Sequence, residues 1–208
     1  MADRREYTRS ALDEASLAPD PFAQFGAWYR DASAAGLLDV DAMTLATSTP
    51  DGTPSARVVL LKQFDARGFV FFTDARSRKG EELAANPHAA LVFYWAPLER
   101  QVRVTGAVSR LPAGETEEYF RTRPLESRLG AWASVQSAPI AGRDALEARL
   151  REVRDQFPHG DVPLPPHWSG YRVEPTAVEF WQGREGRLHD RLCYLATPGG
   201  WRVERLSP

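Results

Sequence analysis

The stretch of sequence that decides the fold runs from residue 43 to residue 110 and reads MTLATSTPDGTPSARVVLLKQFDARGFVFFTDARSRKGEELAANPHAALVFYWAPLERQVRVTGAVSR. Short runs rich in β-branched and aromatic residues alternate here with turn signals, which is typical of strands joined by tight connections. Residues 50–53 (PDGT) and 65–68 (DARG) have the composition of hairpin loops. The pattern predicts an antiparallel meander with strands at 43–49, 55–64, 69–73, 89–95 and 101–110.

The flanking sequence adds helices and further strands to this meander. Apolar residues at helical spacing predict helices over 22–38, 77–86, 113–122 and 143–157, and strand patterns return at 170–181 and 191–205. Because strands joined by hairpins dominate, we predict a mainly β fold: an antiparallel barrel with peripheral helices. We expect one domain over 21–208, preceded by an N-terminal arm over 1–20. The exposed edges of so small a barrel favour a dimer.

Composition excludes several classes of protein. The chain has 208 residues, 43% of them apolar, and no run near the ~18 apolar residues of a membrane span, so a globular protein with no membrane partner is expected. A net charge of −2 argues against a nucleic-acid partner. The single cysteine, Cys193, and an N-terminus without an apolar leader predict a cytoplasmic protein. We find no metal-binding motif, P-loop or Rossmann motif.

Two segments place cations at the ends of predicted elements. Arg57 and Lys62 flank an apolar run, and their odd spacing puts them on opposite faces of a flat strand, so a bulge or a site shared between subunits would be needed to unite them. Ser77, Arg78 and Lys79 open a predicted helix, where free N–H groups, the helix dipole and two cations favour a phosphate. Solvated strand ends and a simple serine cap are the alternative interpretations.

Amide side chains form a second group of candidates. Gln101 and Arg103 share one face of a predicted strand, and Gln136 with Ser137 offers another amide and hydroxyl. Amides on a sheet can bind the edge of a heterocycle, because they donate and accept hydrogen bonds. Ordinary surface residues are the alternative.

Two further clusters suit an anionic ligand. Tyr119, Arg123 and Ser127 are spaced four residues apart, and a guanidinium between two hydroxyls suits a phosphate monoester. If residues 187–191 form a strand, then Arg187, His189 and Arg191 point the same way. Three potential cations on one face repel one another unless an anion lies between them, so this cluster indicates a functional site. An exposed helix face is the alternative for the first cluster.

Taken together, these motifs resemble the pyridoxamine 5'-phosphate oxidase family, the FMN enzymes of vitamin B6 metabolism. The resemblance runs nearly end to end and is carried by RREYT (4–8), RVVLLK (57–62), SRK (77–79), LERQV (98–102), GAW (130–132), QS (136–137), VPLP (162–165), VEFWQG (178–183) and RLHDR (187–191). It implies a homodimeric FMN-binding split barrel with the flavin held between the subunits, which would also unite Arg57 with Lys62.

The resemblance implies a role for individual residues. FMN contacts fall on Arg57, Lys62, Phe72, Thr73, Arg78, Lys79, Gln101, Gln136, Ser137, Trp181 and Arg191. Substrate contacts fall on Lys62, Tyr119, Arg123 and Ser127 around a phosphate, on Arg187 and His189 as catalytic residues at a pyridine ring, and on Arg4 and Tyr7 of an arm that can cover the site. The implied reaction oxidises pyridoxamine 5'-phosphate or pyridoxine 5'-phosphate to pyridoxal 5'-phosphate, with hydride passing to FMN and dioxygen ending as hydrogen peroxide.

The sequence departs from the family at two places. Phe72 stands where relatives often have tyrosine, so only a backbone contact to the flavin is expected there. Asp13 and Glu14 occupy a stretch that is commonly basic, which argues against a phosphate site outside the active site. Two other functions stay open: a flavin reductase that consumes NAD(P)H, and a carrier of FMN or pyridoxal phosphate without catalysis.

Overall fold

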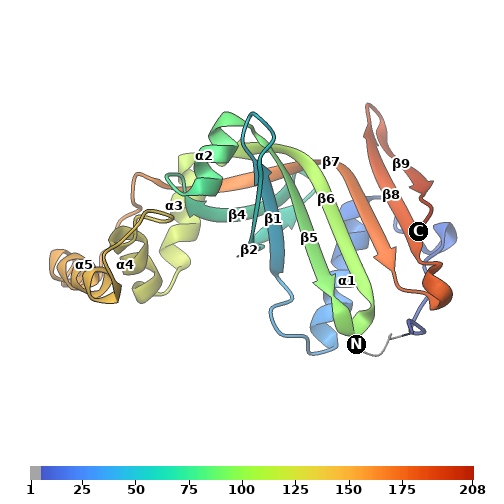
Figure 1. The fold of residues 1–208 in the computed structure, drawn as a ribbon, viewed down its shortest axis with the longest axis horizontal. Coiled ribbons are helices and arrows are strands. Elements are labelled where there is room, and N and C mark those ends of the chain that lie inside the picture. Colours follow the sequence, from blue (N-terminus) through green and yellow to red (C-terminus); the bar gives the residue numbers. More distant parts are fainter. Residues whose placement is uncertain (1–5) are drawn as a thin grey trace.

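The computed structural model describes residues 6–208, and its core is one curled sheet of nine antiparallel strands (Figure 1). The strand order is β2-β1-β5-β6-β7-β4-β3, and β8 and β9 continue the sheet from β7. This confirms the predicted mainly β barrel with peripheral helices. The strands are β1 (Ala42–Ser48), β2 (Pro54–Leu60), β3 (Gln63–Asp65), β4 (Gly68–Asp74), β5 (His88–Trp95), β6 (Arg100–Arg110), β7 (Trp168–Gln182), β8 (Asp190–Thr197) and β9 (Gly200–Arg205).

The longest strand, β7, gives the sheet its shape. Its first half pairs with β4 and its second half with β8, while β6 runs beside both halves. The register between β6 and β7 shifts at Thr105/Gly106, opposite Pro175. A bulge bends a strand, and a proline cannot donate to the ladder, so both features favour a bend at this point. The sheet therefore divides into two wings that share one strand.

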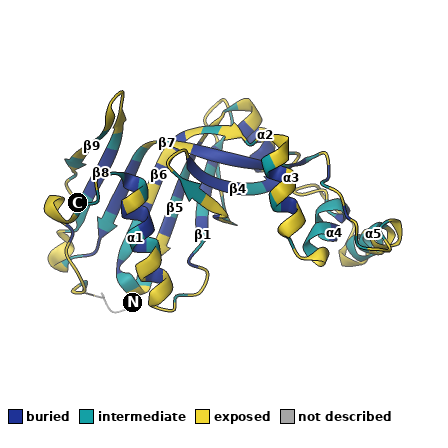
Figure 2. Ribbon diagram, turned by 180° about the vertical axis from the view of Figure 1, so that it is seen from behind, coloured by how far each residue is buried: buried dark blue, intermediate teal, exposed yellow. Residues whose placement is uncertain are grey.

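Helix α1 (Pro21–Ala34) fills the inner face of the sheet, as Figures 1 and 2 show from opposite sides. Asp20 caps it, because its carboxylate accepts from the N–H groups of the first turn at 2.9 Å. Phe25 is fully buried, and its ring centroid lies 4.9–5.0 Å from those of Phe64, Phe69 and Phe93. The alternation of buried and exposed residues along β5 follows from this one-sided cover.

The other helices lie at the edges of the sheet. Helix α2 (Arg78–Ala85) packs beside β1, whereas α3 (Ala113–Thr122), α4 (Leu125–Ala133) and α5 (Arg143–Gln156) extend beyond one end, far from β8 and β9 (Figure 1). These last three helices have a small core of their own around Phe120, Leu129, Val162 and Trp168. Short 3-10 turns are η1 (Glu14–Ser16), η2 (Ala96–Leu98) and η3 (Glu185–Arg187).

One predicted strand is wrong in its extent. The segment 55–64 forms two strands, β2 and β3, which belong to different wings of the sheet. Leu61 N–H still bonds to Asp41 O at 2.8 Å, but Lys62 N–H bonds to Val70 O at 2.9 Å. The chain therefore leaves the β1 side and joins β4 within two residues. Within residues 6–208, no helix is both long and apolar enough to cross a bilayer.

The ring cluster around Phe25 yields a stability prediction. We expect Phe25→Ala to lower the free energy of unfolding by about 3–5 kcal/mol, because a fully buried ring is replaced by a cavity. Urea unfolding followed by tryptophan fluorescence measures the change. Leu38→Ala is the control, since Leu38 is 91% exposed and its loss should change the free energy by less than about 0.5 kcal/mol. Equal effects of the two substitutions would contradict the assignment of this core.

Candidate functional site

A polar cavity of about 270 Å³, here called the cation cavity, is formed by residues of β2, β4, α2 and the C-terminal end of α3. Four of its lining residues are cations, and no described residue that lines it is a carboxylate. One sign of charge in a concave site attracts an anion. Eight of the predicted site residues line the cavity: Arg57, Lys62, Phe72, Thr73, Lys79, Tyr119, Arg123 and Gln136.

The break between β2 and β3 brings Arg57 and Lys62 to the same cavity. A flat strand would have separated them, but the chain turns from β1 toward β4 between the two residues. Their side chains have different partners: Lys62 Nζ lies 3.2 Å from Asp41 Oδ2, and Arg57 Nη2 lies 3.4 Å from Glu82 Oε2. Arg57 and Lys62 were expected on opposite faces of one strand. Because the strand breaks between them, both reach the same cavity within one chain.

Lys79 is a buried cation that faces neutral oxygens. It lies in the first turn of α2, which Ser77 caps through its hydroxyl. Its Nζ lies 2.6 Å from Gln136 Oε1 and 3.2 Å from Thr73 Oγ1, and no carboxylate of the described residues lies within 4.0 Å. Burial, together with the nearby Arg57, lowers the pKa of Lys79. An anion in the cavity would supply the missing counter-charge.

The opposite wall of the cavity is aromatic and carries a second cation. The Phe72 and Tyr119 rings are stacked at 4.0 Å, and Trp168 lies 5.1 Å from Phe72 in nearly the same plane orientation. Arg123 Cζ lies 4.7 Å from the Trp168 ring, and its buried Nη1 has no hydrogen-bond partner among the described residues. Burial lowers the pKa of Arg123 and raises that of Tyr119. The wall of the cavity therefore contains a buried guanidinium donor whose hydrogen bond is unsatisfied among the described residues.

Three predicted residues lie beside the cation cavity. Ser127 lines a neighbouring cavity together with Arg123 and Gln136. The exposed Arg78 donates from Nε to Glu82 Oε1 at 2.8 Å. Ser137 is exposed and has a left-handed backbone with φ 70°. A non-glycine residue in this region is uncommon and indicates a local constraint.

The remaining residues that were predicted to contact FMN form a row on the outer face of the sheet. Gln101 of β6 is paired with Trp181 of β7, which is paired with Arg191 of β8. Arg191 donates from Nε to Glu179 Oε1 at 2.8 Å, and Glu179 also pairs with Arg103 at 3.2 Å. The row, which we call the outer row, therefore presents an amide, an indole and a guanidinium side by side.

The N-terminal arm packs against one end of the outer row. The Tyr7 ring meets Trp181 at 5.8 Å and His189 at 5.6 Å, both edge to face. Gly183 makes this contact possible, because a Cβ there would lie 2.7 Å from Tyr7 Cγ. His189 Nδ1 accepts from the backbone N–H of Arg184 at 3.1 Å. Arg4, predicted to act with Tyr7, lies outside the described residues.

The condition under which Arg187, His189 and Arg191 would share a face, a strand over residues 187–191, is not met. Residues 185–187 form η3, with left-handed backbone at Gly186 (φ 61°) and Arg187 (φ 63°), and β8 begins only at Asp190. The shared face expected of Arg187, His189 and Arg191 therefore does not exist. Arg187 is exposed, whereas His189 packs on Trp181 at 4.7 Å.

The cation cavity and the outer row lie at opposite ends of β7. Trp168 lines the cavity at the start of the strand, and Trp181 belongs to the outer row near its end. Thirteen residues at ~3.3 Å each span about 43 Å in a straight strand, a distance that the bend reduces. No interaction found among residues 6–208 joins the two groups within one chain.

Sequence reasoning missed three residues of the site. Glu82, Trp168 and Gly183 are buried next to predicted contacts. Glu82 follows Arg78 by four residues, a spacing that predicts an ion pair on a helix. For Trp168 we find no local signal, because its role depends on packing against α3.

The curled sheet, with the cation cavity and the outer row on it, places the protein in the FMN-binding split-barrel class, as two solved structures show. PhzG from Burkholderia lata 383, in complex with tetrahydrophenazine-1-carboxylic acid, matches with a TM-score of 0.89 and 32% identity over 95% of this chain and 98% of its own. A pyridoxamine 5'-phosphate oxidase-related, FMN binding protein from Nostoc punctiforme matches in fold, with a TM-score of 0.71 and 22% identity over 93% and 100% of the chains.

Sequence comparison places the chain within this class. The family model for pyridoxamine 5'-phosphate oxidase matches residues 29–157, and that for the pyridoxine 5'-phosphate oxidase C-terminal dimerisation region matches residues 168–208. Pyridoxine/pyridoxamine 5'-phosphate oxidases of Rubrobacter xylanophilus and Cyanothece sp. are 57% and 54% identical over 99% of this chain and 94% and 96% of theirs. The chain belongs to the pyridoxamine 5'-phosphate oxidase family, whose cofactor is FMN, and it is an oxidoreductase of this type.

The contact between Gly183 and Tyr7 predicts a way to release the arm. We expect Gly183→Ala to displace Tyr7, since the new Cβ would overlap its ring, and to speed trypsin cleavage after Arg9. Arg9 is held by Glu99 Oε2 and Pro97 O, contacts that depend on a docked arm. Gly199→Ala is the matched control, because no atom lies within 4 Å of its added Cβ. Equal cleavage rates in the two variants would show that this contact does not hold the arm.

Proposed function

We propose that two copies of the chain bind FMN between them and oxidise pyridoxamine 5'-phosphate or pyridoxine 5'-phosphate to pyridoxal 5'-phosphate. The observation that carries the proposal is the cation cavity, with four cations and no lining carboxylate among the described residues. The residues fit phosphorylated ligands, since among residues 6–208 Lys79 has no carboxylate partner and Arg123 Nη1 has no hydrogen-bond partner. Burying unpaired cations is costly, and anionic ligands would offset that cost.

The distance between the cation cavity and the outer row supports a homodimer. One chain holds the two groups apart at the ends of β7, so a single flavin would reach both only if a second copy supplies one of them. The exposed side of β2 offers an apolar surface for such a copy, with Val58 68% and Leu60 43% exposed. The match to a dimerisation region over residues 168–208 supports the same assembly.

In this arrangement, the residues of each group have separate tasks. Arg57, Arg78 and Lys79 would hold the FMN phosphate, with Lys62, Phe72, Thr73, Gln136 and Ser137 along the flavin of the same copy. Gln101, Trp181 and Arg191 of the other copy would complete the cofactor site. Lys62, Tyr119, Arg123 and Ser127 would bind the substrate phosphate, which lies far from the reacting carbon and orients it.

When bound, FMN accepts the hydride from the C4' carbon of the substrate, and dioxygen is the final acceptor and leaves as hydrogen peroxide. Arg187 and His189 would act at the pyridine ring. Because His189 Nδ1 accepts the Arg184 N–H, the proton of its neutral ring lies on Nε2. His189 is therefore arranged to orient the substrate by donating a hydrogen bond, and not to take up its proton. Tyr7 would cover the ring from the arm.

The proposal predicts a specific product. Protein loaded with FMN, given pyridoxine 5'-phosphate in air, should form pyridoxal 5'-phosphate and an equal amount of hydrogen peroxide. Absorbance of pyridoxal phosphate and a peroxidase-coupled assay measure the two. Consumption of added NADPH without formation of pyridoxal 5'-phosphate would instead support a flavin reductase, and tight flavin binding without turnover would support a carrier. The cytoplasmic location and the boundary of the arm at residue 20 stay predictions.

Separate clusters predict separate kinetic effects. We expect Arg123→Ala to raise KM at least about tenfold with a smaller effect on kcat, since it removes a buried partner of the substrate phosphate. Arg187→Ala should lower kcat with a smaller effect on KM, because it acts near the reacting carbon. Steady-state kinetics with pyridoxine 5'-phosphate at saturating FMN measures both. The reverse pattern would contradict this division of roles.

A further inference from the structure

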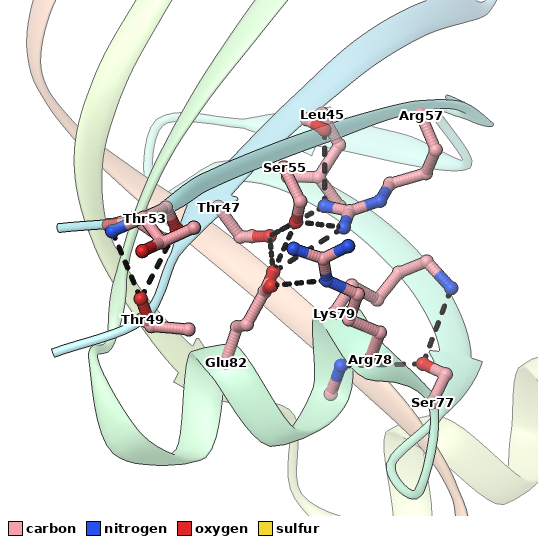
Figure 3. Close-up of polar contacts among 12 residues, drawn as sticks. Leu45, Thr47, Thr49, Thr53, Ser55, Arg57, Ser77, Arg78, Lys79 and Glu82 are labelled. Atoms are coloured by element: carbon pink, nitrogen blue, oxygen red, sulfur yellow. Dashed lines mark hydrogen bonds and ion pairs between the residues drawn. The ribbon is translucent and has the colours of Figure 1, made fainter. Parts of the chain in front are cut away.

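Beneath the cation cavity lies a carboxylate, Glu82, that is almost completely buried. Its side chain is 4% exposed and projects from α2 toward β1 and β2 (Figure 3). Oε2 accepts from the hydroxyls of Thr47 and Ser55, both at 2.5 Å, and lies 3.4 Å from Arg57 Nη2. Oε1 accepts from Arg78 Nε at 2.8 Å. One carboxylate thus joins the two arginines proposed to hold the FMN phosphate.

The surroundings keep Glu82 ionised. Burial alone would raise the pKa of this carboxyl, but hydrogen bonds from Ser55, Thr47, Arg78 and Arg57 outweigh it and lower the pKa to about 2. A negative charge at this place weakens the positive field of the cavity. The negative charge of Glu82 therefore does not help to attract an anion, and we explain its position by the geometry that it imposes on its neighbours.

The geometry of Arg57 supplies that reason. Its Nη1 donates to Thr47 Oγ1 at 2.6 Å, and its Nη2 donates to Ser55 Oγ at 2.5 Å, the two hydroxyls that also donate to Glu82. Arg78 is bound only through Nε, and no other partner of its guanidinium is found among the described residues. Arg57 is held by Glu82 of α2 and by Thr47, Ser55 and the Leu45 carbonyl oxygen of β1 and β2 (Figure 3). Among the described residues, its Nε–H is therefore left for a ligand, as are the terminal N–H groups of Arg78.

We infer that Glu82 is a positioning residue, which orients Arg57 and Arg78 so that Arg57 Nε–H and the terminal N–H groups of Arg78 bind the phosphate of FMN. This inference rests on the proposed position of the flavin phosphate. Thr47 and Ser55 take part in this positioning, because each hydroxyl donates a hydrogen bond to the Glu82 carboxylate and accepts one from Arg57. A rigid pair of guanidiniums loses less side-chain entropy when the phosphate binds than two free arginines would.

The test compares FMN with riboflavin, which lacks the phosphate. Dissociation constants are measured by quenching of flavin fluorescence for the wild-type protein, Glu82→Gln and the control Glu81→Gln, which removes the same charge from an exposed neighbour on α2. We expect Glu82→Gln to weaken FMN at least tenfold and riboflavin less than twofold, and Glu81→Gln to change neither by more than twofold. Inorganic phosphate should also compete less well against FMN in Glu82→Gln.

Three outcomes would overturn the inference. Equal loss of both flavins would show a merely structural role, and tighter FMN binding would show that the Coulombic effect of the carboxylate dominates. Glu82→Asp keeps the charge but shortens the side chain, and it also serves if the glutamine variant does not fold. If its ratio of the FMN to the riboflavin dissociation constant equals that of the wild-type protein, the geometry of the carboxylate is unimportant. A wild-type protein that binds neither flavin would instead contradict the proposed function.

Discussion

The structure depends on one long strand, β7, which is hydrogen-bonded into both wings of the sheet. β7 pairs with β4 near its start and with β8 near its end, and the bulge opposite Pro175 lets it bend between the two. Everything that positions the candidate site follows from this strand. β4, together with β2, α2 and α3, forms the cation cavity, while β6, β8 and the end of β7 form the outer row. The strand that joins the two groups therefore also holds them apart within one chain.

The electrostatics of the cation cavity show a conflict between stability and binding. Lys79 and Arg123 are partly or fully removed from water without a carboxylate partner among the described residues, and burial lowers the pKa of both. Such groups destabilise an empty protein, and any anion that binds only the folded state stabilises it. Arg57 and Lys62 are treated differently, since Glu82 and Asp41 neutralise them. The cavity thus contains two kinds of cation. Arg57 and Lys62 are held in place by carboxylates, whereas Lys79 and Arg123 keep a positive charge that attracts an anion.

Local patterns in the sequence were sufficient for most of the fold, whereas Phe72 and Thr73 of the cation cavity were predicted only from the family resemblance, and Trp168 was missed. Strand alternation, hairpin composition and the serine cap of α2 are local features, and the structure confirms them. The split of 55–64 into β2 and β3 was not predictable, because it is caused by pairing of Lys62 with Val70 on another strand. The hypothesis of a strand over 187–191 fails for a different reason: Gly186 permits a left-handed turn that a period-two pattern cannot reveal. Glu82 was missed because its partners come from β1 and β2, and only folding brings them to α2.

The division of the core indicates which parts of this architecture can vary independently. The cofactor cations stand on β2 and α2, which pack on the main core, whereas Tyr119, Arg123 and Ser127 belong to helices with a small core of their own. PhzG, with the same fold, was solved with a carboxylic acid bound rather than a phosphate ester. The residues proposed to bind the substrate phosphate thus stand on helices whose small core is separate from the core beneath the residues proposed to bind the cofactor.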